Sequence, residues 1–199
     1  HATSKEIEDL VNVRNIQPTD IMDSTTTDPG DASYTKIVLN KKTAWVRLKA
    51  GQEKAAAFLE THRYAALMGG SMAFTKMEGT TANAKDKVAY SALANIQDSM
   101  VVGGSGYVEA NNVAFPKIVA GGVLAHDMAA GQKDKGGNAI NSEWVPTQSR
   151  LLLRGEDISA DSLGNTANPA KVASPDNLKF SEKLRTLFIG EDSGMHVNN

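Results

Sequence analysis

The chain has 199 residues and a formal net charge of -2, with 22% charged residues and no cysteine. This length allows one or two domains with a sizeable core, and the near-balanced charge argues against a nucleic-acid-binding protein, which needs a basic surface to neutralise phosphates. The lack of cysteine excludes disulfides, thiolate metal sites and a cysteine nucleophile, and no apolar run approaches the roughly 18 residues of a membrane-spanning helix.

Residues 1–33 predict a helix followed by a loop. Ser4 is a suitable N-cap, and the apolar residues that follow it fall at helical spacing. The Thr-, Asp-, Pro- and Gly-rich residues 24–33 have the composition of a loop. We therefore expect an N-terminal helix and loop extension ahead of a main domain at residues 34–199.

The N-terminal extension also contains three aspartates that raise the question of a calcium site. They are Asp23, Asp28 and Asp31. Their spacing does not match that of an EF-hand loop, so we interpret them as parts of an ordinary acidic loop.

A hairpin and a helix are predicted next. Residues 34–39 and 43–48 alternate apolar and polar side chains, which predicts two strands joined by a turn at residues 40–42. The alanine-rich residues 51–63 predict one helix. His62 is interpreted as a helix-end residue, because no second histidine or acid accompanies it at metal-ligand spacing.

The remainder of the chain is predicted to form short strands separated by polar loops. Strands are expected at residues 74–78, 87–92, 121–128, 178–180 and 185–189, and loops at residues 80–86, 130–142 and 155–173. Strands in series without helices between them favour an antiparallel, mainly β fold such as a β-propeller or part of one. Because the chain ends shortly after a strand, we expect this domain to continue beyond residue 199.

Two acidic residues far apart in the chain each lie at the edge of a predicted strand. Glu78 ends the segment Phe74-Thr75-Lys76-Met77-Glu78-Gly79, and Asp176 lies in the predicted turn Ser174-Pro175-Asp176-Asn177-Leu178. Two carboxylates from distant segments commonly hold a hard cation. Lys76 is expected on the same face of its strand as Glu78, since side chains alternate with period two, and would add a site for a phosphate or another anion. In the alternative interpretation, Glu78 is a solvated turn residue beside a glycine.

The same two motifs resemble those of the PhoX-type alkaline phosphatase family, and the similarity extends over residues 45–199. Further similar segments are Lys87-Val88-Ala89-Tyr90, Gly121-Gly122-Val123 and Arg185-Thr186-Leu187-Phe188-Ile189. The resemblance implies a six-bladed propeller with inserted helices, hydrolysis of phosphomonoesters, and iron and calcium in a central funnel. It also implies export through the twin-arginine route, and hence a periplasmic or extracellular location.

The resemblance assigns roles to five residues of this sequence. Glu78 corresponds to a calcium ligand and Asp176 to another metal ligand. Lys76 lies where the family has a phosphate-binding arginine, and lysine offers a point charge in place of a bidentate fork. Asp192 corresponds to the acid that ends the following strand, with Glu191 beside it, and both are further expected metal ligands. The family's iron-binding cysteine lies upstream, so ligands for Fe³⁺ would lie largely outside this chain.

These observations leave functions of different classes open. The first is a metal-dependent phosphomonoester hydrolase, in which this chain supplies part of the Ca²⁺ and phosphate site and the remaining segments of its own polypeptide are its partner. The second is a non-catalytic calcium-binding propeller segment with a structural or assembly role. A third is a proteolytic fragment that stays docked to the rest of its chain, because open strand edges are unstable alone.

Overall fold

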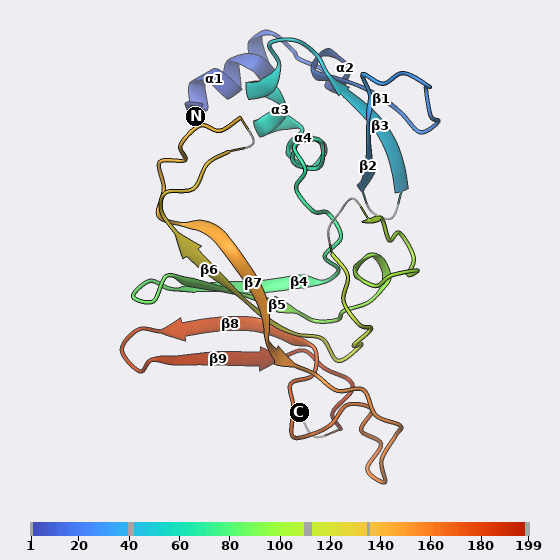
Figure 1. Cartoon of the computed structure of the whole chain (residues 1–199), viewed down its shortest axis with the longest axis vertical. Helices are drawn as coiled ribbons and strands as arrows, with labels where there is room; N and C mark the ends of the chain where they lie inside the picture. The colour runs from blue at the N-terminus through green and yellow to red at the C-terminus, as the bar shows by residue number, and fades with distance from the viewer. Residues whose placement is uncertain (1, 40–41, 110–112, 135, 198–199) are drawn as a thin grey trace. The chain divides into compact units, whose positions relative to one another are not determined.

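The computed structural model describes residues 2–39, 42–109, 113–134 and 136–197, and it is mainly β, as predicted (Figure 1). The chain forms two compact units. The first comprises His1–Ala73 and Val102–Ala114, and the second comprises Phe74–Val101 and Phe115–Asn199. The predicted boundary at residue 33 falls inside the first unit. No helix in the described residues is both long and apolar enough to cross a bilayer.

The first unit begins with the predicted helical segment. Its elements are α1 (Ser4–Glu8), the π-helical turn η1 (Asp9–Val13) and α2 (Pro18–Ile21). Thr3, and not Ser4, is the N-cap of α1. The Thr3 hydroxyl accepts the Glu6 N–H at 3.2 Å and the Glu6 carboxylate accepts the Thr3 N–H at 2.7 Å. Thr3 is preferred because Glu6 stands three residues after it, which completes a reciprocal capping box.

The predicted hairpin of the first unit is confirmed and gains a third strand. The strands are β1 (Met22–Thr25), β2 (Thr35–Leu39) and β3 (Lys42–Leu48). They pair antiparallel in the order β1-β3-β2. Residues 40 and 41 of the predicted turn lie outside the described residues.

The single helix predicted at residues 51–63 is wrong, because two helices form. They are α3 (Glu53–Leu59) and α4 (Thr61–Leu67). Glu60 separates them with φ -127° and ψ 37°, and its carboxylate binds Arg63 Nε at 2.7 Å and Nη2 at 2.9 Å. The bend lets both helices pack on the core of Ile21, Met22, Ile37 and Val46. Tertiary packing therefore overrides the helix propensity of the alanine-rich segment.

The second unit contains an open, antiparallel sheet and a hairpin. The sheet has the order β4 (Met77–Asn83), β5 (Val88–Leu93), β6 (Gly122–Ala129) and β7 (Val145–Arg154). The hairpin consists of β8 (Pro175–Ser181) and β9 (Thr186–Glu191), and a short 3-10 helix, η2 (Asp98–Met100), follows β5. The predicted strands at residues 87–92 and 121–128 and the predicted C-terminal hairpin are confirmed. None of the sheets in the described residues closes on itself.

The boundaries of β4 differ from the predicted ones. A strand was expected at residues 74–78 and a loop at residues 80–86, but β4 begins at Met77 and continues to Asn83. Lys76 has φ 48°, a left-handed conformation that cannot continue an extended strand. The polar residues that follow pair with β5, and this pairing makes them a strand despite their weak sequence signal.

The β8–β9 hairpin lies beside β4 and β5 (Figure 1). Side-chain contacts hold it there. The rings of Tyr90 and Phe180 stack with centroids 5.8 Å apart. The Arg185 guanidinium lies 5.0 Å from the Phe180 ring centroid and donates to Asn83 Oδ1 at 3.1 Å, and it also pairs with Asp86. Hydrogen bonds and ring contacts therefore hold the end of β8 beside the end of β4.

Candidate metal and anion site

The entry of β4 is irregular at the position of Glu78. Met77 pairs with Leu93 and Thr80 with Ser91, so Glu78 and Gly79 fall in a break of the register. Three steps on β4 match two on β5, as in a β-bulge. Bulges bend a strand and redirect its side chains, and they are common beside active sites.

The entry of β8 repeats this arrangement around Asp176. Pro175 pairs with Glu191 and Leu178 with Ile189, so the register break falls on Asp176 and Asn177. The expectation that Asp176 lies in a turn before the strand is therefore wrong, because β8 already begins at Pro175. The pairing of Pro175 with the end of β9 draws the predicted turn residues into the strand.

Each of these two acids also follows a residue with strained backbone. Lys76 stands two positions before Glu78 and has φ 48°, and Ser174 stands two positions before Asp176 and has φ 46°. Non-glycine residues adopt positive φ rarely and at a cost, and such residues concentrate at functional sites. Both strand entries thus share a left-handed residue, a bulge and an acid.

The two bulges touch each other at Gly79. A Cβ atom built on Gly79 would lie 2.5 Å from the Asp176 carbonyl oxygen, 2.7 Å from the Leu178 nitrogen and 3.1 Å from the Asn177 Cα. Only glycine permits this approach of the two backbones. The structure therefore brings the segments of Glu78 and Asp176 together, although they lie far apart in the sequence.

Lys76 forms an ion pair with Glu78. Its Nζ lies 3.2 Å from Glu78 Oε1, and the side chains are 59% and 31% exposed. Strand alternation does not account for this proximity, because Lys76 precedes β4. The left-handed backbone at Lys76 and the bulge at Glu78 bring the two side chains together.

The two C-terminal acids, Glu191 and Asp192, contact the backbone that precedes Asp176, and the Glu191 carboxylate already has two partners. Glu191 Oε1 accepts the Ala173 N–H at 2.8 Å, and Oε2 lies 3.0 Å from His196 Nδ1. Asp192 is exposed, and its N–H donates to the Ser174 carbonyl at 3.1 Å. The structure thus connects both residues to the backbone that leads into Asp176.

The donor atoms at the two bulges suit a hard cation better than a soft one. Carboxylate and carbonyl oxygens are the ligands that calcium prefers, and Glu78 and Asp176 supply both kinds. Within the described ranges, however, no group of three or more His, Asp or Glu side chains is arranged to hold a metal ion. The oxygen atoms of Glu78 and Asp176 are therefore of the kind that calcium binds.

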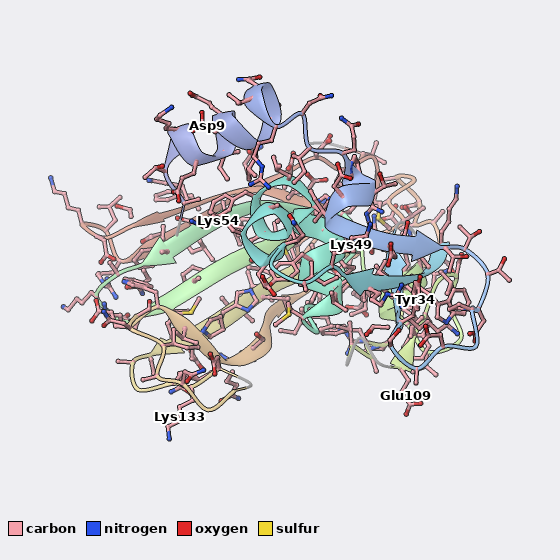
Figure 2. All side chains as sticks on the ribbon, turned by 90° about the horizontal axis from the view of Figure 1, so that it is seen from above. Asp9, Tyr34, Lys49, Lys54, Glu109 and Lys133 are labelled. Carbon is pink, nitrogen blue, oxygen red and sulfur yellow. The ribbon has the colours of Figure 1, made fainter. Side chains whose placement is uncertain are left out.

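The aspartates of the first unit serve another purpose. Arg47 Nη2 lies 2.8 Å from Asp23 Oδ2, and Nη1 lies 3.3 Å from Asp31 Oδ2. The Arg47 guanidinium stacks over Tyr34, which Figure 2 labels together with Lys49. The hydrogen bond from Arg47 holds the pKa of Asp23 below its usual value. Charge pairing with arginine therefore accounts for Asp23 and Asp31. The interpretation of Asp23 as part of a loop is wrong, because Asp23 lies in β1 and pairs with Arg47 of β3, whereas Asp28 and Asp31 lie in the loop that follows.

Sequence reasoning missed two residues that shape the candidate site. Gly79 permits the contact between the bulges, and His196 contacts Glu191. The Glu-Gly pair at a strand end was a usable signal for the first, because a glycine inside a strand often marks a bulge or a close approach of another backbone. No pattern in the sequence identified His196.

Comparison of the chain with protein-family models, with curated proteins and with solved structures finds no match.

Proposed function

We propose that this chain carries part of the metal and phosphate site of a phosphomonoester hydrolase similar to the PhoX family. The observation that supports this proposal is the contact between the two bulges, which places the segments of Glu78 and Asp176 side by side. Two irregular strand entries, each with an acid, meet at one glycine. Strained backbone costs free energy and exposed charge adds little stability, so their combination favours a functional role.

The ion pair at β4 joins a cation-binding and an anion-binding side chain. In the proposed site Glu78 and Asp176 hold calcium, which when bound stabilises negative charge on phosphoryl oxygens. A divalent ion at Glu78 competes with Lys76 Nζ for the carboxylate. This competition frees the Lys76 ammonium to bind a phosphate oxygen, where it offsets the negative charge that develops in the transition state. Its single point charge orients phosphate less strictly than the arginine fork of the family.

The sheet of the second unit supports a propeller in this proposal. Strands β4, β5, β6 and β7 pair in chain order as an antiparallel meander, which is the organisation of a propeller blade. Hairpin β8–β9 would then begin the next blade. In this proposal the remaining blades and the iron ligands come from further segments of the polypeptide, and the protein is periplasmic or extracellular.

The test is hydrolysis of para-nitrophenyl phosphate by the complete polypeptide that contains this chain, with Ca²⁺ and Fe³⁺ supplied. We expect Glu78→Gln and Asp176→Asn each to lower kcat by about 100-fold, the typical effect of removing one electrostatic contact to the transition state. Glu143→Gln is the matched control, because the Glu143 carboxylate is exposed and pairs with Lys87. Unchanged kcat in both site variants would refute the proposal.

Glu78 and Asp176 also suit one other function. A non-catalytic calcium-binding propeller segment needs only oxygen ligands for a structural ion, some of which can be carbonyl groups or water. Titration calorimetry with Ca²⁺ separates the two functions when it is combined with the hydrolysis assay. Calcium binding that depends on Glu78 and Asp176, without hydrolysis by the complete polypeptide, would favour the structural role.

A further inference from the structure

Glu191 was expected to be a metal ligand, but its carboxylate already has two partners within the protein. Oε1 accepts the backbone N–H of Ala173 at 2.8 Å, and Oε2 lies 3.0 Å from His196 Nδ1. The Glu191 and His196 side chains are 23% and 11% exposed. A carboxylate that already has a partner on each oxygen is poorly suited to bind an ion that arrives from solvent.

The backbone that Glu191 contacts leads directly into the Asp176 bulge. Ala173 is fully buried, so its N–H needs an acceptor inside the protein. The Ser174 N–H donates to the Ala120 carbonyl at 2.9 Å, and the Ser174 carbonyl accepts the Asp192 N–H at 3.1 Å. Together with the bond from the Ala173 N–H to Glu191, these make three hydrogen bonds, and two of them involve residues at the end of β9, Glu191 and Asp192. They hold Ser174 in the left-handed conformation from which β8 starts.

His196 contacts Oε2 of Glu191, the oxygen that does not accept from Ala173. Its Nε2 lies 3.3 Å from the Asn168 carbonyl oxygen, while Nδ1 faces Glu191. The imidazole therefore bridges the carboxylate to the loop that precedes β8. This bridge restricts the rotamer of Glu191, so Oε1 stays directed at Ala173.

We propose that Glu191 is a positioning residue, which sets the path of Ala173 and Ser174 and thereby places Asp176 beside Gly79. The importance of this placement for metal binding rests on the proposed function, whereas the contact itself does not. The role differs from that of a ligand in one testable respect. Glutamine can replace a positioning glutamate, because its carbonyl oxygen still accepts the Ala173 N–H, but it cannot replace a carboxylate that binds the ion through its charge.

The experiment compares Glu191→Gln and Glu191→Ala in the 199-residue chain, with Glu143→Gln as the control. Calorimetric titration with Ca²⁺ measures affinity, and amide hydrogen exchange by NMR measures protection of Ala173 and Ser174. We expect glutamine to keep Ca²⁺ affinity within about threefold. Alanine should weaken it by about 10- to 100-fold, the usual cost of losing an outer-shell partner, and should speed exchange at Ala173 by at least about tenfold.

The opposite results would overturn the proposal. If Glu191→Gln weakens Ca²⁺ binding as much as Glu191→Ala does, with native amide protection, Glu191 is a ligand. If the alanine variant does not fold, the glutamine variant is compared with wild type: Ca²⁺ affinity within about threefold supports positioning, and a loss of about 10- to 100-fold with native amide protection refutes it.

A wild-type chain that binds no Ca²⁺ contradicts the metal site and not the positioning role. Amide exchange then decides: faster exchange at Ala173 in the alanine variant alone supports positioning, and unchanged exchange in both variants refutes it.

Discussion

The Asp176 carbonyl oxygen lies in the space that a side chain at residue 79 would need. The absence of one Cβ atom therefore permits the contact between the bulges of β4 and β8. In strands, glycine is otherwise unfavourable because it packs no side chain and loses more backbone entropy than other residues. The close approach of the β8 backbone explains why a glycine stands between Glu78 and the rest of β4.

Gly79→Ala is predicted to separate the two bulges. The added Cβ would lie 2.5 Å from backbone oxygen, and backbone cannot rotate away as a flexible side chain can. We expect a loss of about 1–3 kcal/mol in the free energy of unfolding, the usual cost of overpacking, measured by urea denaturation.

Gly190→Ala is the matched control in β9. There the new Cβ would meet the Asn177 Cβ at 3.7 Å, an ordinary contact. A loss in the Gly190 variant equal to that in the Gly79 variant would contradict the steric explanation.

The titration of His126 on β6 bears on the stability of the second unit. Its Nδ1 lies 2.7 Å from Ser149 Oγ and its Nε2 lies 3.2 Å from Ser91 Oγ. Burial lowers the pKa of His126 below its usual value, and the charge of neighbouring Asp127 opposes the shift. Hydroxyl groups can donate or accept, so both contacts suit the neutral imidazole.

Stability of the second unit is therefore predicted to fall as the pH decreases. The folded protein holds His126 neutral, whereas the unfolded chain takes up a proton near pH 6.5. The contribution is present above that pH and declines as the pH falls toward the lower pKa of the folded state. Urea denaturation at pH 7 and pH 5 should show a smaller loss for His126→Gln than for wild type. An equal loss in the exposed His62→Gln control and in His126→Gln would contradict this assignment.

At the scale of elements, the β8–β9 hairpin depends on Arg185 for its position against β4 and β5. This one side chain contacts the Phe180 ring, Asn83, Asp86 and Glu182. A planar guanidinium can stack and donate in several directions at once, which an ammonium cannot. The contacts explain how a separate two-stranded hairpin is held beside the four-stranded sheet.

Arg185→Lys is predicted to loosen the hairpin. We expect a loss of about 1 kcal/mol, since the side chain is partly exposed and its ion pairs are weakened by solvent. Amide exchange should increase in residues 178–189 and remain unchanged in α1. Lys183→Ala in the same turn is the control, and an equal effect there would show that the turn itself, and not the Arg185 contacts, is responsible.

At the scale of the whole molecule, each unit has its own buried residues, and the proposed site belongs to the second unit alone. All five candidate residues, Lys76, Glu78, Asp176, Glu191 and Asp192, lie in Phe74–Val101 or Phe115–Asn199. Ligand binding at the site should therefore be visible as stabilisation of that unit.

Calcium is predicted to raise the thermal unfolding midpoint of the second unit. A ligand that binds only the folded state adds about 2.7 kcal/mol at a hundredfold excess over its Kd, which corresponds to a shift of several degrees. Mg²⁺ at the same concentration should have less effect, because it demands a stricter octahedral geometry. Scanning calorimetry with Ca²⁺, Mg²⁺ or EDTA measures this. An equal shift in the Glu78→Gln/Asp176→Asn double variant would place the ion elsewhere.

The sequence by itself determined that the protein is mainly β, and it located the hairpins, because alternation of apolar and polar residues is a local property of a strand that faces a core. It also singled out Glu78, Lys76 and Asp176. It did not determine where α3 ends, where β4 begins or what Glu191 contacts. Those features depend on packing: Glu60 bends the chain so that both helices reach one core, and pairing with β5 extends β4.

Only the tertiary structure decided that Glu78 and Asp176 belong to neighbouring segments. Bulges and left-handed residues arise where a strand must fit two partners at once. The sequence of one segment does not identify the other segments with which it pairs. The approach of β8 to Gly79 joins residues separated by most of the second unit, so its physical cause, the lack of room for a Cβ atom, exists only after folding.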